Sequence, residues 1–206
     1  MIDIHCHILP EVDDGSRSLN ESIEMAMIAK EQGITKIVNT SHYHPDFRYK
    51  KGEELLKELE DFNNVLKENM IDIEVVIGNE IYYTKDLIKE IDELDFYTLN
   101  NSRYILIELP PTNFPKDLCN IVYELKEKNY IPVFAHVERY REVQENPELI
   151  YEVINAGAII QVNSHSILGK SGKELQKVCN TLLNRNMVHV VGTDAHSSKR
   201  RTPKYF

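Results

Sequence analysis

Two short motifs place metal-binding side chains at alternate positions near opposite ends of the chain. His5 and His7 are separated by one residue, and so are Asp194 and His196. Alternate side chains of a β-strand lie on the same face, so each motif would direct two ligands to one side of a sheet. Imidazole and carboxylate ligands together favour Mn, Fe or Zn over Ca or Mg, and the lack of thiolates argues against a structural zinc site.

Further ionisable side chains lie at the ends of other apolar runs. Glu80 and Glu108 follow segments rich in Val, Ile and Leu, where an unpaired buried carboxylate would be costly. His42 and His136 end two more such runs. One of these groups alone is usually structural, but several that meet at one place repel each other unless cations lie between them. We therefore expect a cluster of metal ions rather than a set of solvated strand ends.

The elements that must position these side chains alternate along the chain. Seven runs rich in Ile and Val are predicted to be buried strands, and five stretches between them are predicted to be helices. This alternation predicts a parallel sheet with right-handed crossovers. Seven units in one short domain favour a closed or nearly closed α/β barrel, whose chemistry lies at the C-terminal ends of the strands. The expected strands are residues 1–7, 36–42, 73–82, 104–109, 131–137, 158–164 and 188–194, and the expected helices are residues 18–32, 53–69, 116–128, 147–155 and 173–186.

The composition limits the class of protein. The chain has 206 residues, of which 42% are hydrophobic and 28% charged, which fits one globular domain over residues 1–206 and excludes a disordered chain. We expect no membrane span, because no apolar run is long enough, and no signal peptide, because the N-terminus has no basic stretch followed by an apolar one. The net charge of −9 disfavours nucleic acid as a partner. Three cysteines without a CxxC motif point to a reducing, cytoplasmic location.

A series of segments carries a family resemblance over essentially the whole chain. The segments are MIDIHCHILPEVDDGSRSL, GNEIYY, ILIELP, FAHVERY, QVNSHSILGKSG and VGTDAHSSKRRTP. In them the sequence resembles the PHP superfamily (polymerase and histidinol phosphatase domains). Within that superfamily it is most similar to the manganese-dependent bacterial protein-tyrosine phosphatases of capsule and exopolysaccharide operons. The resemblance implies a distorted (β/α)7 barrel of the PHP type.

The resemblance also implies three divalent metal ions, manganese by preference, with Fe, Zn, Co or Mg as substitutes. The residues themselves do not distinguish Asp14 from Asp13, or His42 from His44, so those two choices depend on the family. The implied ligands are His5, His7, Glu80 and Asp194 for the first ion; Glu80 as a bridge with Glu108 and His136 for the second; and Asp14, His42 and His196 for the third.

Two arginines match the substrate-phosphate arginines of the family. They are Arg139 and Arg201, although the neighbouring Arg200 leaves the second assignment open. Guanidinium groups would bind the phosphoryl oxygens while metal ions activate a water molecule. The proton donor to the leaving group is either His42 or a metal-bound water, and the sequence does not choose between them.

The predicted activity is metal-dependent hydrolysis of protein phosphotyrosine. The resemblance suggests a bacterial tyrosine kinase of capsule or exopolysaccharide synthesis as the substrate, and it leaves a homo-oligomer open. The alternatives are a small-molecule phosphomonoesterase of the histidinol-phosphatase type, a phosphodiesterase acting on nucleic acid, and a non-catalytic scaffold stabilised by metal. Cys179 and Arg185 have the spacing of a cysteine-phosphatase loop, but they lie in a helical pattern without glycines, so we regard that match as coincidental.

Three features depart from the family pattern. Val137 stands where proline is usual, and His165 is an additional histidine near the end of the sixth run. The chain stops at Phe206, whereas relatives usually continue for another helical stretch. We expect either a short natural version or a missing C-terminal segment.

Overall fold

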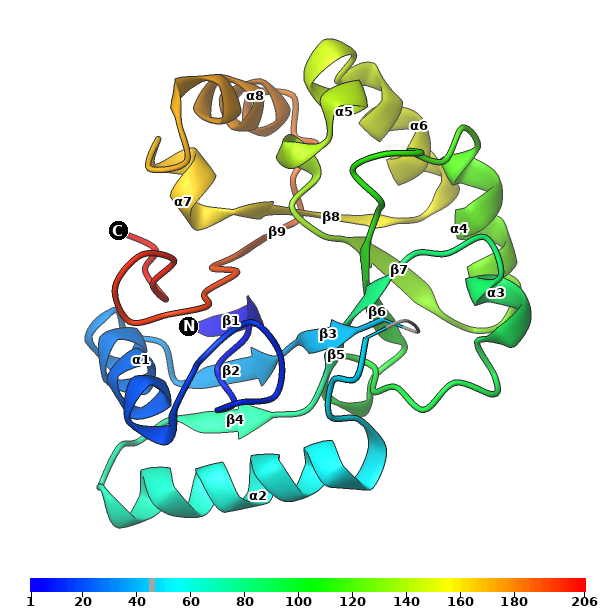
Figure 1. The fold of residues 1–206 in the computed structure, drawn as a ribbon. Coiled ribbons are helices and arrows are strands. Elements are labelled where there is room, and N and C mark those ends of the chain that lie inside the picture. The colour runs from blue at the N-terminus through cyan, green and yellow to red at the C-terminus, as the bar shows by residue number, and fades with distance from the viewer. Residues whose placement is uncertain (45–46) are drawn as a thin grey trace.

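Parallel strands form the centre of the computed structural model, which describes residues 1–44 and 47–206. Helices lie around the outside of these strands (Figure 1). The strand pairs of the described chain are all parallel and join runs that follow one another in the sequence. The strands are β1 (Ile2–Cys6), β2 (Lys36–Asn39), β3 (Ser41–Tyr43), β4 (Glu74–Val76), β5 (Asn79–Tyr82), β6 (Tyr104–Glu108), β7 (Ile131–Phe134), β8 (Ile159–Asn163) and β9 (Val190–Gly192).

Two of the seven expected strands are each divided into two. Residues 36–42 form β2 and β3, and residues 73–82 form β4 and β5, so the expectation of unbroken strands was wrong at these places. At the first break, the Thr40 N–H donates to the Cys6 carbonyl (2.9 Å), and the Thr40 carbonyl accepts from the Glu80 N–H (3.2 Å). At the second break, a Cβ on Gly78 would lie 2.9 Å from a Val38 methyl. The breaks therefore divide the strands into two sheets, β1-β2-β4 and β3-β5-β6-β7-β8-β9.

The first and last strands meet, so the sheets curl. The Asp194 N–H donates to the His5 carbonyl (2.7 Å), and the His7 N–H donates to the Ala195 carbonyl (2.8 Å). These two bonds, with a bridge between Cys6 and Ala195, hold the N-terminal and C-terminal motifs side by side. The result is an α/β fold with curled parallel sheets.

The five expected helices are confirmed to within two residues at each end. Ser18 caps the first of them, since its hydroxyl accepts a hydrogen bond from the Glu21 N–H at 3.2 Å. Shorter helical segments, which the sequence patterns did not predict, are α3 (Leu87–Glu90), η1 (Leu99–Asn101), η2 (Val137–Arg139), α5 (Arg141–Glu145) and α7 (Ser164–Ile167). The confirmed helices are α1 (Leu19–Glu31), α2 (Gly52–Glu68), α4 (Leu118–Glu127), α6 (Glu148–Ala156) and α8 (Lys173–Asn184).

An apolar cavity of about 450 Å³ lies at the N-terminal end of the strands. This is the end opposite the one at which the sequence predicts the metal ligands. The cavity is lined mainly by aliphatic side chains, with Lys36, Tyr104 and His189 at its margin. Its aliphatic lining consists of Ile2, Ile4, Val38, Leu99, Val133, Ile159 and Val190.

The last ten residues, 197–206, form a tail over the junction of β1 and β9. The hydroxyl of Tyr205 contacts the buried carboxylate of Asp3 and the Val191 carbonyl, each at 3.0 Å. The Ser164 hydroxyl donates to the carbonyl of Lys204 at 2.6 Å. The tail is therefore attached to both sides of the junction.

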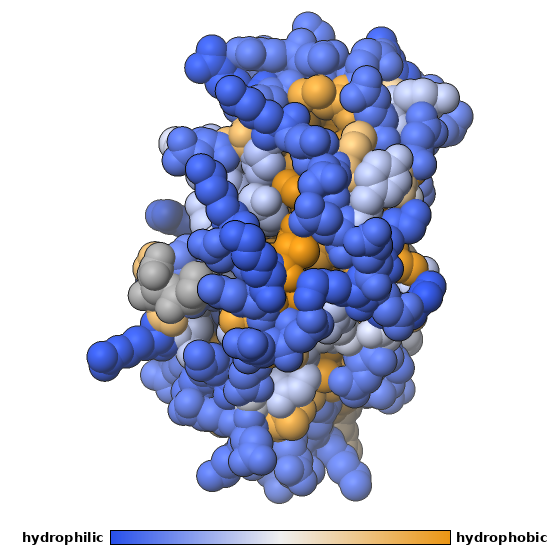
Figure 2. Space-filling view, turned by 90° about the vertical axis from the view of Figure 1, so that its right-hand side faces the viewer, coloured by the Kyte–Doolittle hydropathy of each residue, from blue (hydrophilic) through white to orange (hydrophobic). Residues whose placement is uncertain are grey.

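The face shown in Figure 2 is largely hydrophilic, with a narrow apolar streak between charged side chains. Within residues 1–44 and 47–206, no helix combines the length and the apolar character that crossing a bilayer requires.

Candidate metal centre

All nine predicted metal ligands lie at the C-terminal end of the strands. Eight of them fall into overlapping groups in which one ligand atom from each residue lies within 4.8 Å of the others. His136 joins them through its Nε2, which is 2.9 Å from Glu80 Oε1. The groups are His5, His7, Glu80 and Asp194; His7, Asp14, His42 and His196; and His42, Glu80 and Glu108.

Glu80 lies at the centre of the cluster and is fully buried. Its Oε2 is 3.2 Å from the Nε2 atoms of both His5 and His7, and 3.3 Å from His42 Nδ1. Burial alone would raise the pKa of Glu80, but the surrounding histidines hold it well below its usual value. One carboxylate thus contacts the members of all three groups, as a ligand that bridges two ions would.

Local backbone irregularities aim several of these side chains. The register of β1 against β2 shifts between Asp3 and Cys6, immediately around His5, and such bulges are frequent beside functional sites. His136 and Asp194 follow the ends of their strands and have left-handed backbones, with φ of 34° and 51°. Positive φ is uncommon for residues other than glycine.

This geometry corrects one step of the sequence reasoning. Asp194 and His196 are not alternate residues of a strand, because β9 ends at Gly192 and Asp194 has a positive φ. They still converge, with 3.5 Å between Asp194 Oδ1 and His196 Nδ1. A turn, and not strand alternation, brings this pair together.

The hydrogen bonds of three histidines leave their Nε2 atoms available for metal. His5 Nδ1 donates to Gln161 Oε1 (3.2 Å), and His7 Nδ1 donates to Asp13 Oδ2 (2.7 Å). His196 Nδ1 donates to the carbonyl of Asp194 at 3.0 Å. In a neutral imidazole with its proton on Nδ1, the other nitrogen carries a lone pair. The residues present therefore fit divalent cations bound through Nε2.

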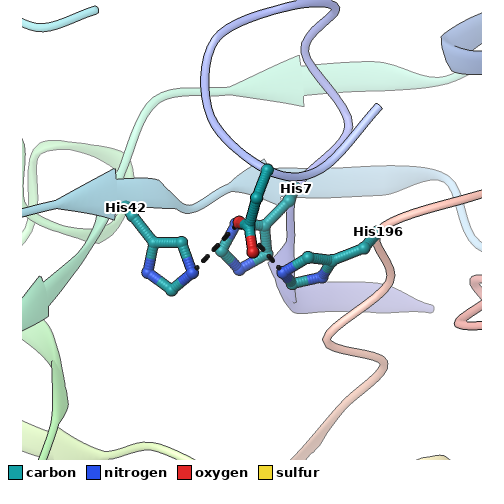
Figure 3. Close-up of side chains that lie close together, drawn as sticks. His7, His42 and His196 are labelled. Atoms are coloured by element: carbon teal, nitrogen blue, oxygen red, sulfur yellow. Dashed lines mark ion pairs between the residues drawn. The ribbon is translucent and has the colours of Figure 1, made fainter. Parts of the chain in front are cut away.

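The two neighbouring aspartates have different positions. Asp13 is held away from the centre by three donors: His7 Nδ1, the His42 N–H at 2.8 Å and the Gly15 N–H at 2.9 Å. Asp14 instead lies 3.4 Å from His42 Nε2 and 3.6 Å from His196 Nε2. Figure 3 shows His7, His42 and His196 converging, with dashed lines for the two ion pairs of Asp14.

His44 lies outside the metal groups. Its ring contacts those of Phe47 and Tyr82, with centroid distances of 4.6 and 4.5 Å. The structure thus brings His42, and not His44, to the cluster.

Two arginines complete the site on the side of Asp194. Arg139 Nη1 lies 3.3 Å from Asp194 Oδ2, and Arg201 forms an ion pair with Asp194 Oδ1. Both side chains are more than 40% exposed, so their outer N–H groups remain accessible. Of the described residues, Arg201 and not Arg200 lines the cavity above the cluster. That cavity is about 160 Å³ and is bounded by Asp14, His42, Glu80, Glu108, His136, Arg139, Asp194, His196 and Arg201.

The ionisation of the site depends on the balance of its charges. Burial lowers the pKa of His7, but the carboxylates of Asp13 and Glu80 outweigh it and raise that pKa to about 10. Burial and the nearby Glu80 raise the pKa of Glu108 to about 8. Without metal, protons on His7 and Glu108 therefore offset the carboxylates at neutral pH. Divalent cations would replace those protons.

Sequence reasoning missed the polar residues of β8 that support the ligands. Gln161 Oε1 accepts from both His5 and the His136 N–H (2.7 Å). Asn163 donates to Asp194 Oδ2 at 2.7 Å. Gln161 and Asn163 have the same alternate spacing that singled out His5 and His7, so their signal was present in the sequence.

Three other residues singled out in the sequence are not among the metal groups. His165 is in α7, with Nε2 3.4 Å from the Thr202 hydroxyl, and it lines a cavity with Arg139, Asp194 and Arg201. Cys179 is buried in α8, and Arg185 pairs with Glu148. The Cys179–Arg185 spacing is therefore coincidental, as expected.

Comparisons with known proteins place the chain among named phosphatases. A family model described as "Capsular polysaccharide synthesis, CpsB/CapC" matches residues 1–206. Tyrosine-protein phosphatase YwqE of Bacillus subtilis is 41% identical over 202 residues, covering 98% of this chain and 79% of the relative. Tyrosine-protein phosphatase CpsB of Streptococcus pneumoniae is 33% identical over 208 residues, covering 98% of this chain and 86% of the relative.

Solved structures show the same relationship. One from a study of YwqE and CpsB as unique metal-dependent tyrosine phosphatases matches with a TM-score of 0.94 and 38% identity, covering 100% of this chain and 83% of the other. The histidinol phosphate phosphatase of Lactococcus lactis matches with a TM-score of 0.65, covering 97% and 87%. At 16% identity, this second match shows a shared fold only.

Proposed function

The chain belongs to the CpsB/CapC family, and we propose that it is a metal-dependent phosphatase that hydrolyses phosphotyrosine on proteins. The observation that carries this proposal is the convergence of three groups of metal-binding atoms beside two accessible arginines. Relatives at 33–41% identity over nearly the whole chain are named tyrosine-protein phosphatases.

We assign three divalent ions to the cluster, with manganese preferred and Fe, Zn, Co or Mg as substitutes. When bound, such ions neutralise phosphoryl oxygens and acidify a water molecule for attack on phosphorus. The proposed ligand sets are His5, His7, Glu80 and Asp194; Glu80, Glu108 and His136; and Asp14, His42 and His196.

Arg139 and Arg201 bind the remaining phosphoryl oxygens in this proposal. Their guanidinium groups are held by the two oxygens of Asp194, which leaves other N–H groups free to donate to the substrate. Hydrogen bonds from fixed donors stabilise the charge that develops in the transition state.

His42 acts as a ligand and not as the proton donor. Its Nδ1 lies 3.3 Å from Glu80 Oε2 and its Nε2 lies 3.4 Å from Asp14 Oδ1, so both nitrogens face the cluster.

The leaving group of phosphotyrosine makes few demands on a proton donor. A phenolate is a better leaving group than an alkoxide and needs less protonation. The site therefore suits phosphotyrosine.

We further propose the biological setting. The substrate would be a bacterial tyrosine kinase of capsule or exopolysaccharide synthesis, in keeping with the description of the family. We also propose that residues 1–206 form one PHP-type domain, a distorted barrel of seven β/α units in which each divided run counts as one strand.

The test is phosphate release by metal-free protein resupplied with Mn or Mg. A phosphotyrosine peptide, a phosphoserine peptide and L-histidinol phosphate serve as the three substrates. We expect Mn-dependent release from phosphotyrosine, lost in His7→Ala while the circular dichroism spectrum is unchanged. Preferred hydrolysis of histidinol phosphate would instead support the small-molecule alternative, and no release from any substrate would refute the proposal.

A further inference from the structure

We propose that a row of aromatic side chains beside the cavity binds the ring of the phosphotyrosine substrate. The row, here called the aromatic wall, consists of His44, Phe47, Tyr49 and Tyr82. This inference rests on the proposed function and deepens it, because it identifies the groups that distinguish an aryl phosphate from an alkyl phosphate.

The wall is a continuous series of ring contacts. The ring of Tyr82 lies 4.5 Å from that of His44, and His44 lies 4.6 Å from Phe47. Phe47 stacks on Tyr49 at 5.4 Å, with only 7° between the ring planes. Tyr49 in turn stacks on His42 at 6.0 Å. The series thus begins on β5 and ends at a proposed metal ligand.

The side chains of the aromatic wall are accessible to solvent. Rings that served only to pack the core would be buried. The Phe47 side chain is 57% exposed, and Tyr49 and Tyr82 are half-buried. The exposed parts of these rings are therefore available to a ligand.

The lining of the cavity offers little apolar surface to a substrate ring. It consists of imidazole, carboxylate and guanidinium groups, which suit a phosphoryl group and cations. The ring must therefore lie at the mouth of the cavity.

The arrangement around the mouth indicates on which side the ring lies. Arg139 and Arg201 occupy the side of Asp194. The wall adjoins the cavity at His42, which lines the cavity and on which Tyr49 stacks. A phosphoryl group bound between the arginines and the cluster would place its phenyl ring against Tyr49 and Phe47.

Aromatic contacts account for a selectivity that the metal cluster alone does not provide. One offset-stacked or edge-to-face ring pair strengthens binding by about 2- to 10-fold. A phosphoserine side chain has no ring and gains nothing from the wall. The wall therefore favours phosphotyrosine over phosphoserine.

The experiment compares two competitive inhibitors that differ only in the ring. Phenylphosphonate and methylphosphonate are measured against p-nitrophenyl phosphate hydrolysis by the Mn-loaded protein. We expect Phe47→Ala and Tyr49→Ala each to raise the phenylphosphonate Ki about 2- to 10-fold, while the methylphosphonate Ki is unchanged. Tyr49→Phe, which keeps the ring, should behave as wild type. Tyr123→Ala, at a tyrosine on α4 that is 55% exposed, is the matched control.

The outcomes separate this inference from the proposed function. Equal changes in both Ki values, or no change in either, would overturn the aromatic wall while leaving the phosphatase activity intact. A wild-type protein that releases no phosphate with any metal would refute the proposed function, and the inference with it.

Discussion

The two ends of the strands have opposite chemistry. At the C-terminal end, carboxylates and imidazoles crowd around Glu80, and the cluster holds excess protons when metal is absent. At the N-terminal end, the aliphatic side chains of Val38, Leu99 and Val133 are buried around the apolar cavity. Burial of apolar surface stabilises a fold without any partner, whereas buried charges are stable only when they are paired. One end of the strands therefore contributes mainly chemistry and the other mainly stability.

The largest effect should come from Arg201, beside the predicted metal ligands. Arg201→Ala should lower kcat/KM for a phosphotyrosine peptide about 10²- to 10³-fold, because it removes a donor to the charge of the transition state. Arg200→Ala is the matched control, since Arg200 is exposed and is not part of the cavity lining formed by described residues. Similar losses in both variants would contradict the assignment of Arg201.

A smaller effect at the same end should come from Asp13. Asp13→Asn removes the negative charge that holds His7 Nδ1 at 2.7 Å, and loss of such a supporting group typically weakens metal binding 10- to 100-fold. Titration of metal-free protein with Mn would measure the change. Unaltered affinity would show that Asp13 has only a structural role.

The pH dependence of metal binding should follow the protons of the cluster. The pKa of His7 is raised to about 10 and that of Glu108 to about 8, so both groups are protonated in the metal-free protein at pH 7. Since metal must displace these protons, affinity should rise with pH, about tenfold per pH unit for each proton released. Calorimetry in two buffers of different ionisation enthalpy would count the protons. Binding without proton release would argue against these two ligands.

The smallest effect on activity should come from the apolar end. Ile159→Val should lower the free energy of unfolding by about 0.5–1.5 kcal/mol and leave kcat/KM unchanged. Urea unfolding and phosphate release, measured on the same preparation, would test this. A fall in kcat/KM under conditions where the variant is fully folded would contradict the division between the two ends.

The sequence predicted the helices and the gathering of the ligands because both have local signals. Amphipathic spacing marks α2 and α4. The alternate spacing of His5 and His7 indicated a shared face, although β1 itself ends at Cys6. The choice of Asp14 over Asp13 depended on the family resemblance, because neighbouring aspartates look alike until the donors around Asp13 are in place. Local patterns do not record which groups surround a side chain in the fold.

The strand breaks and the turns at the ligands could not be predicted for the same reason. Thr40 interrupts its strand because it pairs with Cys6 on one side and Glu80 on the other. The positive φ of His136 and Asp194 goes against their ordinary preferences, so only tertiary contacts maintain it. Residues at a functional site frequently depart from local rules in this way.

The C-terminal tail connects the site of the predicted ligands to the junction of β1 and β9. Arg201 lies beside the ligand cluster, and its carbonyl accepts the N–H groups of His196 and Ser197 at 2.9 and 3.1 Å. Four residues later, Tyr205 contacts Asp3 in β1 and the carbonyl of Val191 in β9. Anion capture by Arg201 should therefore slow amide hydrogen exchange in both strands. By reciprocity, a change that destabilises the junction of β1 and β9 should weaken phosphate binding, and the two coupling free energies should be equal.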